Sequence, residues 1–89
     1  RLAAAFAEVV RVSPSHAMFI ARVIEGFMVA RGQVVRNDLP LLEHLVEVRV
    51  ETRSSPDPAL LPLLAAVTGN SKTSRAARQL AAMVDSKAG

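Results

Sequence analysis

The chain contains no cysteine among its 89 residues. Disulfides, thiolate metal sites and a cysteine nucleophile are therefore excluded, and a small domain of this kind must rest on its hydrophobic core or on a partner. Tryptophan and tyrosine are also absent, so the aromatic side chains are three phenylalanines. The lack of Trp and Tyr argues against a function that stacks bases of single-stranded nucleic acid on aromatic rings.

The sequence also lacks a long hydrophobic run. Its most apolar stretch covers residues 17–30 and is interrupted by Arg22 and Glu25. This stretch is shorter than the about 20 residues that a transmembrane helix needs. We therefore expect no membrane partner and an intracellular setting, cytoplasmic or nuclear. Because the sequence begins with Arg1 rather than Met, we also expect residues 1–89 to be one helical domain from a longer chain.

Alanine, leucine and valine supply most of the 51% hydrophobic content, which argues against disorder. Ala and Leu favour the helix. The predicted fold class is therefore all-α, either a compact bundle or a helical-repeat-like array of four to five short helices. Apolar residues at helical spacing, together with proline and glycine positions, predict helices over residues 2–10, 14–31, 39–53 and 71–86, and a short fourth helix that starts at residue 59 or 62 and ends at residue 68.

Several residues mark the ends of these predicted helices. Pro14 suits the first position of the second helix, and Gly32 is a typical residue just beyond a helix end. Asn70 follows Gly69, and because both tolerate positive φ we expect the pair to end the fourth helix. Ser71 or Thr73 is then expected to cap the fifth helix.

Residues 46–53 allow a second interpretation. They alternate strictly between β-branched or apolar and polar side chains, which is typical of a strand. We favour the helix because the only candidate partner strands, residues 8–12 and 33–35, are short.

The helix predicted over residues 14–31 is apolar nearly all round. Such a helix is either central in its domain or covered by a partner. We expect it to be central and to form part of a surface for another protein or for a second copy of the chain. The residues predicted for this interface are Met18, Ile20, Ile24, Phe27 and Met28. Gly26 costs up to about 1 kcal/mol relative to Ala in such a helix, and we expect close approach of a neighbouring helix as the compensation.

Residues 58–84 combine a short Leu-rich helix, a tight turn and a second helix that begins Ser74-Arg75-Ala76-Ala77 and continues Leu80-Ala81-Ala82-Met83. This pattern resembles the helical pair of a HEAT or armadillo repeat. The resemblance covers about 27 residues and rests on common residue types. It implies a protein-binding scaffold built from stacked helix pairs.

The basic excess lies at the C-terminal end of the sequence. Residues 1–70 hold seven arginines and seven acidic residues, whereas the last 19 residues hold four basic residues and one acid. Residues 62–84 also resemble a helix-turn-helix, which would turn a basic face towards nucleic acid or another anion. The residues predicted for this face are Lys72, Thr73, Arg75 and Arg78. The segment departs from that motif at Asn70, Arg75 and Arg78, where apolar residues are usual.

No set of acid, base and nucleophile converges in the sequence. His16 and His44 lack the spacing of metal ligands, and we expect His16 at the core edge and His44 on the surface. Glu43, Glu47 and Glu51 fall on one helical edge and predict a solvated acidic ridge. We expect no enzyme activity, no cofactor, no metal and no small-molecule substrate. The predicted function is a non-catalytic protein-interaction or oligomerisation module, and the alternative is nucleic-acid binding through the basic C-terminal helix.

Overall fold

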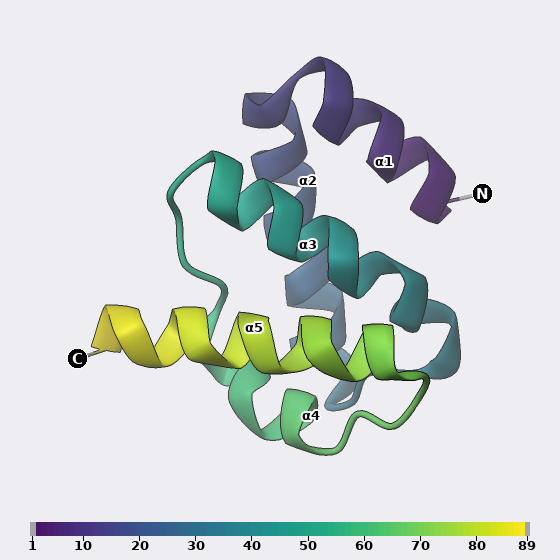
Figure 1. The fold of residues 1–89 in the computed structure, drawn as a ribbon, viewed down its shortest axis with the longest axis vertical. Coiled ribbons are helices and arrows are strands. Elements are labelled where there is room, and N and C mark those ends of the chain that lie inside the picture. The colour runs from purple at the N-terminus through teal and green to yellow at the C-terminus, as the bar shows by residue number, and fades with distance from the viewer. Residues whose placement is uncertain (1, 89) are drawn as a thin grey trace.

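The computed structural model describes residues 2–88, with side chains described as far as Asp85. Within these residues the chain forms five α-helices and two 3-10 turns and has no strand. The elements are α1 (Leu2–Val12), α2 (Pro14–Arg31), η1 (Arg36–Asp38), α3 (Leu39–Glu51), η2 (Pro58–Leu60), α4 (Leu61–Ala65) and α5 (Ser71–Ala88). The predicted all-α compact bundle is therefore confirmed (Figure 1).

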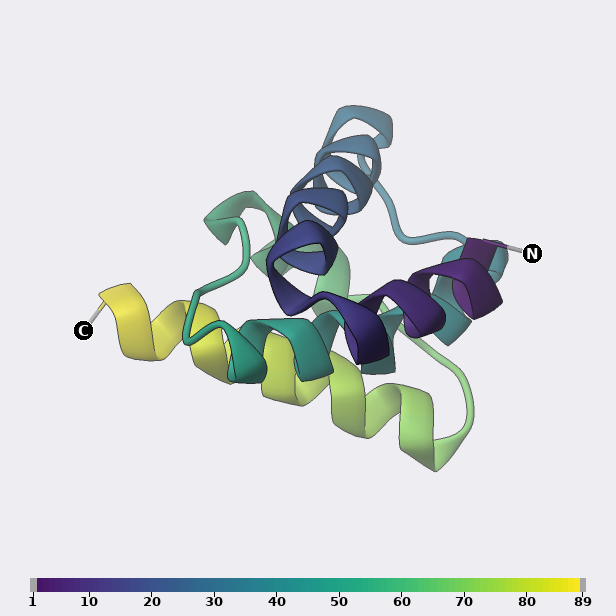
Figure 2. The ribbon, with the colours of Figure 1, turned by 90° about the horizontal axis from the view of Figure 1, so that it is seen from above.

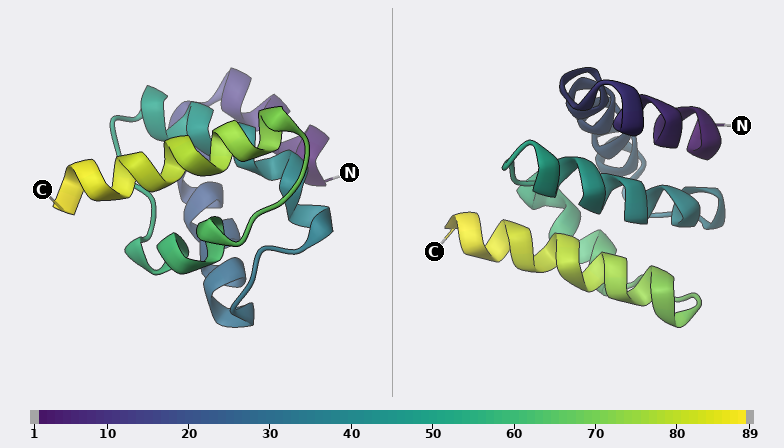
Figure 3. Two further views of the ribbon diagram at one scale, coloured as in Figure 1. Left: turned by 60° about the horizontal axis from the view of Figure 1, so that its bottom comes forward. Right: turned by 45° about the horizontal axis from the view of Figure 1, so that its top comes forward.

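The helix α3 is the central element of the bundle. It contacts α1, α2 and α5, and the right view of Figure 3 shows it between α1 and α5. In Figure 1, α2 crosses behind α3 and α4 lies beneath α5. The prediction that the helix of residues 14–31 is central is therefore wrong. That helix packs one face against α1, α3 and η2, and in Figure 2 its C-terminal half rises clear of the other helices.

The core is aliphatic apart from one phenylalanine. It consists of Phe6, Ala17, Ala21, Ile24, Met28, Leu41, Leu42, Leu45, Val48, Leu60, Leu64, Ala76, Ala77 and Leu80. Small side chains occupy the contact faces of two helices, Ala17 and Ala21 on α2 and Ala76 and Ala77 on α5. Their size lets the neighbouring helices approach closely.

Residues 46–53 are helical down to Glu51, and the strand alternative is wrong. The buried residues Leu45, Val48 and Arg49 follow helical spacing, and this stripe faces the core. Beyond Glu51, Arg53 adopts a left-handed conformation with φ of 52°. The Arg53 N–H donates to the Val50 carbonyl at 3.2 Å, and the Ser54 N–H donates to the Arg49 carbonyl at 3.0 Å. These two bonds form a Schellman ending in which arginine stands where glycine is usual.

The predicted ends of α2 are confirmed. Pro14 lies in its first turn, and Gly32 has φ of 83°. The Gly32 N–H donates to the carbonyls of Met28 and Val29 at 2.9 and 3.1 Å. Ser13 precedes the helix without a capping bond from its side chain.

The fourth helix is shorter than predicted. A 3-10 turn over Pro58–Leu60 precedes α4, and α4 ends at Ala65 rather than near residue 68. Pro62 has no N–H and cannot donate to the Pro58 carbonyl. The Leu61 N–H donates to that carbonyl instead, in the 3-10 pattern.

The start of α5 differs from the prediction in which residue provides the cap. The Asn70 Oδ1 accepts the Thr73 N–H at 2.8 Å and the Thr73 hydroxyl at 3.0 Å. Asn70 is therefore the N-cap of α5, and the expectation that Gly69 and Asn70 take positive φ is wrong. Among residues 2–88, positive φ occurs only at Gly32 and Arg53.

Candidate protein-interaction surface

Three large apolar side chains form an exposed row along α2. Phe19 and Phe27 are each 67% exposed and Val23 is 48% exposed. They are spaced by four residues, so they lie on one line along the helix. We call these three residues the outer row of α2. Two of the three phenylalanines of the chain lie in it, which makes it the most conspicuous exposure of apolar area on a helix that also contributes to the core.

The opposite side of α2 explains why the outer row is left open. Ala17, Ala21, Ile24 and Met28 of α2 are all buried against the neighbouring helices. The contacts of α2 with α1, α3 and η2 use this inner side. The helix is therefore apolar on two sides, and the described part of the chain covers only one of them.

The predicted interface residues divide between these two sides. Phe27 is exposed, and Met18 and Ile20 are half-buried. Ile24 is 6% exposed and Met28 is 1% exposed, so both belong to the core and are withdrawn from the interface set. Phe19 and Val23 take their place, although sequence reasoning did not include them. Phe19, Val23 and Phe27 follow one another at intervals of four residues, and this spacing in the sequence could have identified Phe19 and Val23 as interface residues.

Gly26 lies beside the outer row, and no neighbouring helix approaches it. A Cβ added at Gly26 would meet nothing within 4 Å. The expected close approach within the domain is therefore wrong, and in the isolated domain this glycine only weakens α2.

We predict that Gly26→Ala raises the free energy of unfolding by about 0.5–1 kcal/mol, because alanine restricts the unfolded chain and fits the helix. Urea unfolding at low protein concentration measures the change. Gly32→Ala is the matched control: its φ of 83° disfavours a Cβ, so that variant should lose stability. A loss of stability in Gly26→Ala would contradict the open environment of this residue.

An apolar groove lies next to the outer row, between α1 and α2. Its volume is about 430 Å³, and it is lined by Glu8, Val9, Val12, Ser13, His16 and Ile20. Val12 is 68% exposed at its edge. His16 is exposed rather than at the core edge as predicted, and its Nδ1 lies 2.9 Å from the Ser13 hydroxyl. The groove extends the apolar surface of the outer row onto α1.

The predicted basic face of α5 is exposed but only partly free. Arg75 and Arg78 are exposed, and the Lys72 ammonium lies 3.7 Å from a Glu43 carboxylate oxygen of α3. Thr73 is half-buried, and both its N–H and its hydroxyl donate to Asn70. These donors of the first turn are therefore occupied by the cap, which weakens the case for an anion site there.

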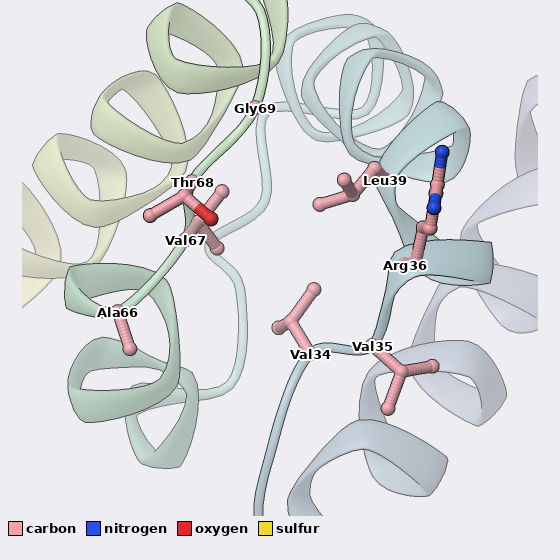
Figure 4. A pocket seen from close by; sticks show the side chains of 8 residues that line it. All are labelled: Val34, Val35, Arg36, Leu39, Ala66, Val67, Thr68 and Gly69. Atoms are coloured by element: carbon pink, nitrogen blue, oxygen red, sulfur yellow. The ribbon is translucent and has the colours of Figure 1, made fainter.

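A cavity of about 350 Å³ separates the α2–α3 connection from the α4–α5 connection. Figure 4 shows Val34 and Leu39 on one wall and Val67 and Thr68 on the other, with the Arg36 side chain extending away from the opposite wall. Five of its eight lining residues are aliphatic, and the arrangement offers no general base or nucleophile pair.

A second hollow, of about 410 Å³, lies between α3 and α5. It is lined by Glu43, His44, Val46, Glu47, Lys72 and Gln79. The His44 Nδ1 lies 2.7 Å from a Glu47 carboxylate oxygen, and the ring meets Phe6 edge-on at a centroid distance of 6.2 Å. His44 is thus held in place by packing and by its neighbour in the helix. The hollow contains no hydroxyl or thiol that this histidine could activate.

The deepest polar feature is a buried ion pair that sequence reasoning missed. The Arg49 guanidinium of α3 donates twice to the Glu25 carboxylate of α2, at 2.6 and 3.1 Å. The two side chains are 5% and 1% exposed. The same carboxylate accepts the Asp57 N–H at 3.1 Å, and Arg49 also donates to the Ser54 hydroxyl at 3.0 Å. The cluster ties α2, α3 and the loop of residues 52–57 together, and we assign it a structural role.

Two further observations limit the kinds of site to consider. Across residues 2–88, no group of three or more His, Cys, Asp or Glu side chains is arranged to hold a metal ion. In the same part of the chain, none of the helices combines the length and apolar character that crossing a membrane requires.

Comparison of the chain with protein-family models, with curated proteins and with solved structures finds no match. The function is therefore proposed from the residues themselves.

Proposed function

We propose that this chain is a non-catalytic helical module that binds a protein through the outer row of α2 and the adjoining groove. The observation that carries the proposal is the alignment of Phe19, Val23 and Phe27, all exposed, on a helix whose other side is buried in the core. Aromatic side chains, phenylalanine included, are enriched in the cores of protein interfaces.

The area involved supports a binding surface rather than scattered exposure. Because a phenylalanine has 150–250 Å² to bury, the outer row exposes about 300 Å² of apolar surface. Contiguous patches of this size on a small protein are often functional. Covering it would contribute roughly 7 kcal/mol before the costs of association are subtracted.

The hollows among the described helices also support a non-catalytic role. The cavity of Figure 4 and the hollow at His44 are two of the hollows among these helices, and neither brings an acid, a base and a nucleophile together. The likeness of residues 58–84 to a HEAT or armadillo pair stays a prediction that agrees with a scaffold function.

Nucleic-acid binding through α5 is the second candidate, favoured by the exposure of Arg75 and Arg78 one turn apart. Against it, the helix-turn-helix register would bury those two positions, and the first turn of α5 is already capped.

We predict that a tagged bait of this chain captures a protein from lysate, and that Phe19→Ser with Phe27→Ser lowers the capture at least tenfold. The captured protein should remain after nuclease treatment and with the bait Arg75→Glu, Arg78→Glu. All four residues are exposed, so each bait should unfold close to the wild-type midpoint. That measurement is the control for folding.

The opposite pattern would contradict the proposal. Capture that is lost on nuclease treatment and with Arg75→Glu, Arg78→Glu, but is kept with the two serine substitutions, would establish the nucleic-acid alternative. Affinity for DNA or RNA would then fall steeply as salt is raised.

A further inference from the structure

We propose that the outer row of α2 is covered by a second copy of this chain, with the two α2 helices antiparallel about a twofold axis at Val23. This inference rests on the proposed function, and it identifies the binding partner as a second copy of the chain. It follows from five features of the surface: its symmetry, the sizes of the flanking residues, its charge, the adjoining groove and its area.

The outer row is symmetric about its centre. Phe19 and Phe27 lie four residues before and four residues after Val23, and their exposed fractions are equal. In an antiparallel pair centred on Val23, each Phe19 therefore faces the Phe27 of the other copy, and the two valines face each other. A twofold interface requires a surface that is complementary to itself in this way.

The flanking residues are complementary in size in the same arrangement. Gly26 and Ile20 lie on opposite flanks of the outer row, and in an antiparallel pair equal flanks meet, so the glycine of one copy lies beside the Phe19 of the other. His16 and Ala30 lie seven residues on either side of Val23 and close to the line of the outer row, so they also meet. A large residue thus meets a small one at both positions. The open space over Gly26, which has no use within the domain, accommodates the Phe19 of the second copy.

The charge distribution allows the outer rows of two copies to pack against each other. A twofold axis brings the side chains at its centre near their own copies, so a charge at the centre of the row would repel itself. The outer row and its small neighbours carry no charge, and the nearest ionised side chain on the inner side, Glu25, is paired with Arg49. Exposed Arg22 lies on the flank of the row, where its guanidinium can extend into solvent.

The groove between α1 and α2 provides space for the Phe27 side chain of the other copy. In the antiparallel pair, Phe27 of one copy lies over Phe19 and His16 of the other, beside the groove that Val12 and Ile20 line. The groove volume of about 430 Å³ is large enough for one phenyl ring. The twofold axis repeats this insertion, so two Phe27 rings are covered in each dimer.

The area sets the strength of the dimer. The outer row and the groove together offer roughly 400 Å² on each copy, about half of the roughly 800 Å² that a standard stable interface buries on each partner. We therefore expect a dimer that dissociates in the micromolar range and forms as the concentration is raised.

Cysteine cross-linking in this cysteine-free chain tests the geometry. Val23→Cys lies on the axis, where two facing helices bring equivalent positions within disulfide reach, so mild oxidation should link most of the chains into dimers. Ala30→Cys is the matched control. It lies seven residues from the axis, so its two copies are about 20 Å apart and should not link. A mixture of Ala30→Cys and His16→Cys should link as a heterodimer.

Sedimentation equilibrium tests the association without a cross-link. The wild-type mass should rise from monomer to dimer between about 1 and 500 µM, a range set by the expected weak interface. Phe27→Ser should weaken dimerisation at least tenfold. Val50→Ser is the control, because Val50 is a similarly exposed apolar residue, at 61%, on α3 rather than on α2. It should leave the dimer unchanged.

Each other outcome overturns the inference. Self-linking of Ala30→Cys would indicate a parallel or shifted pair, and a monomer at every concentration without Val23→Cys dimers would exclude a second copy. If the chain is monomeric but the two serine substitutions still abolish capture of a different protein, the proposed function stands and only this inference fails. If capture is also insensitive to those substitutions, both fail.

Discussion

Arg49→Ala is expected to lower the free energy of unfolding by about 3–5 kcal/mol, because it leaves the buried Glu25 carboxylate without its partner. Glu25 is 1% exposed, and its carboxylate accepts two of its three hydrogen bonds from Arg49. In the variant the Glu25 carboxylate keeps only the Asp57 N–H as a donor. Since small domains have only about 5–15 kcal/mol of stability, the variant should unfold at a much lower urea concentration.

Two matched variants separate the charge pair from the simple loss of a side chain. Arg22→Ala removes an exposed arginine on the helix that carries Glu25, and it should change the stability by less than about 0.5 kcal/mol. Glu25→Leu combined with Arg49→Met replaces both charges by apolar groups, and it should recover most of the loss. If Arg49→Ala costs no more than Arg22→Ala, the ion pair does not hold α2 and α3 together.

The helices themselves could be predicted because local chemistry determines where they begin and end. Pro14 has a φ suited to the first turn of α2, and Gly32 takes the left-handed conformation that ends it. The prediction was wrong where the local chemistry fits two different structures. Asn70 suits a helix end and a helix start equally well, and the hydrogen bonds to Thr73 decide for the start of α5.

The Glu25–Arg49 pair could not be predicted because it joins residues 24 positions apart. Periodicity assigns a residue to a face of its helix, but it does not say which residue of another helix lies opposite. A partial hint existed: Glu25 follows Ala21 by four residues and precedes Met28 by three, so it shares their inward side. An acid on a core-facing stripe requires a buried partner.

The predicted interface set contained both buried and exposed residues for a related reason. A helix that is apolar on both sides does not reveal which side faces the core. The side of α2 that carries Ala17 and Ala21 faces the core, because these small side chains allow the neighbouring helices to pack against it. Ile24 and Met28 share that side and are buried with them, while Phe27 is left on the other. The bulkier side chains were therefore a poor guide to the core.

Leu45→Ala is expected to cost about 2–5 kcal/mol, in the upper part of that range, because it opens a cavity that the surrounding helices cannot close. Leu45 is fully buried on α3, which has helices packed on several sides. Collapse of one neighbour into the space would pull it away from the rest of the core. Val50→Ala on the same helix is the matched control. It removes two methyl groups from a side chain that is 61% exposed, so it should change the stability by less than about 0.5 kcal/mol. Urea unfolding of both variants measures the difference, and equal stabilities would contradict the central position of α3.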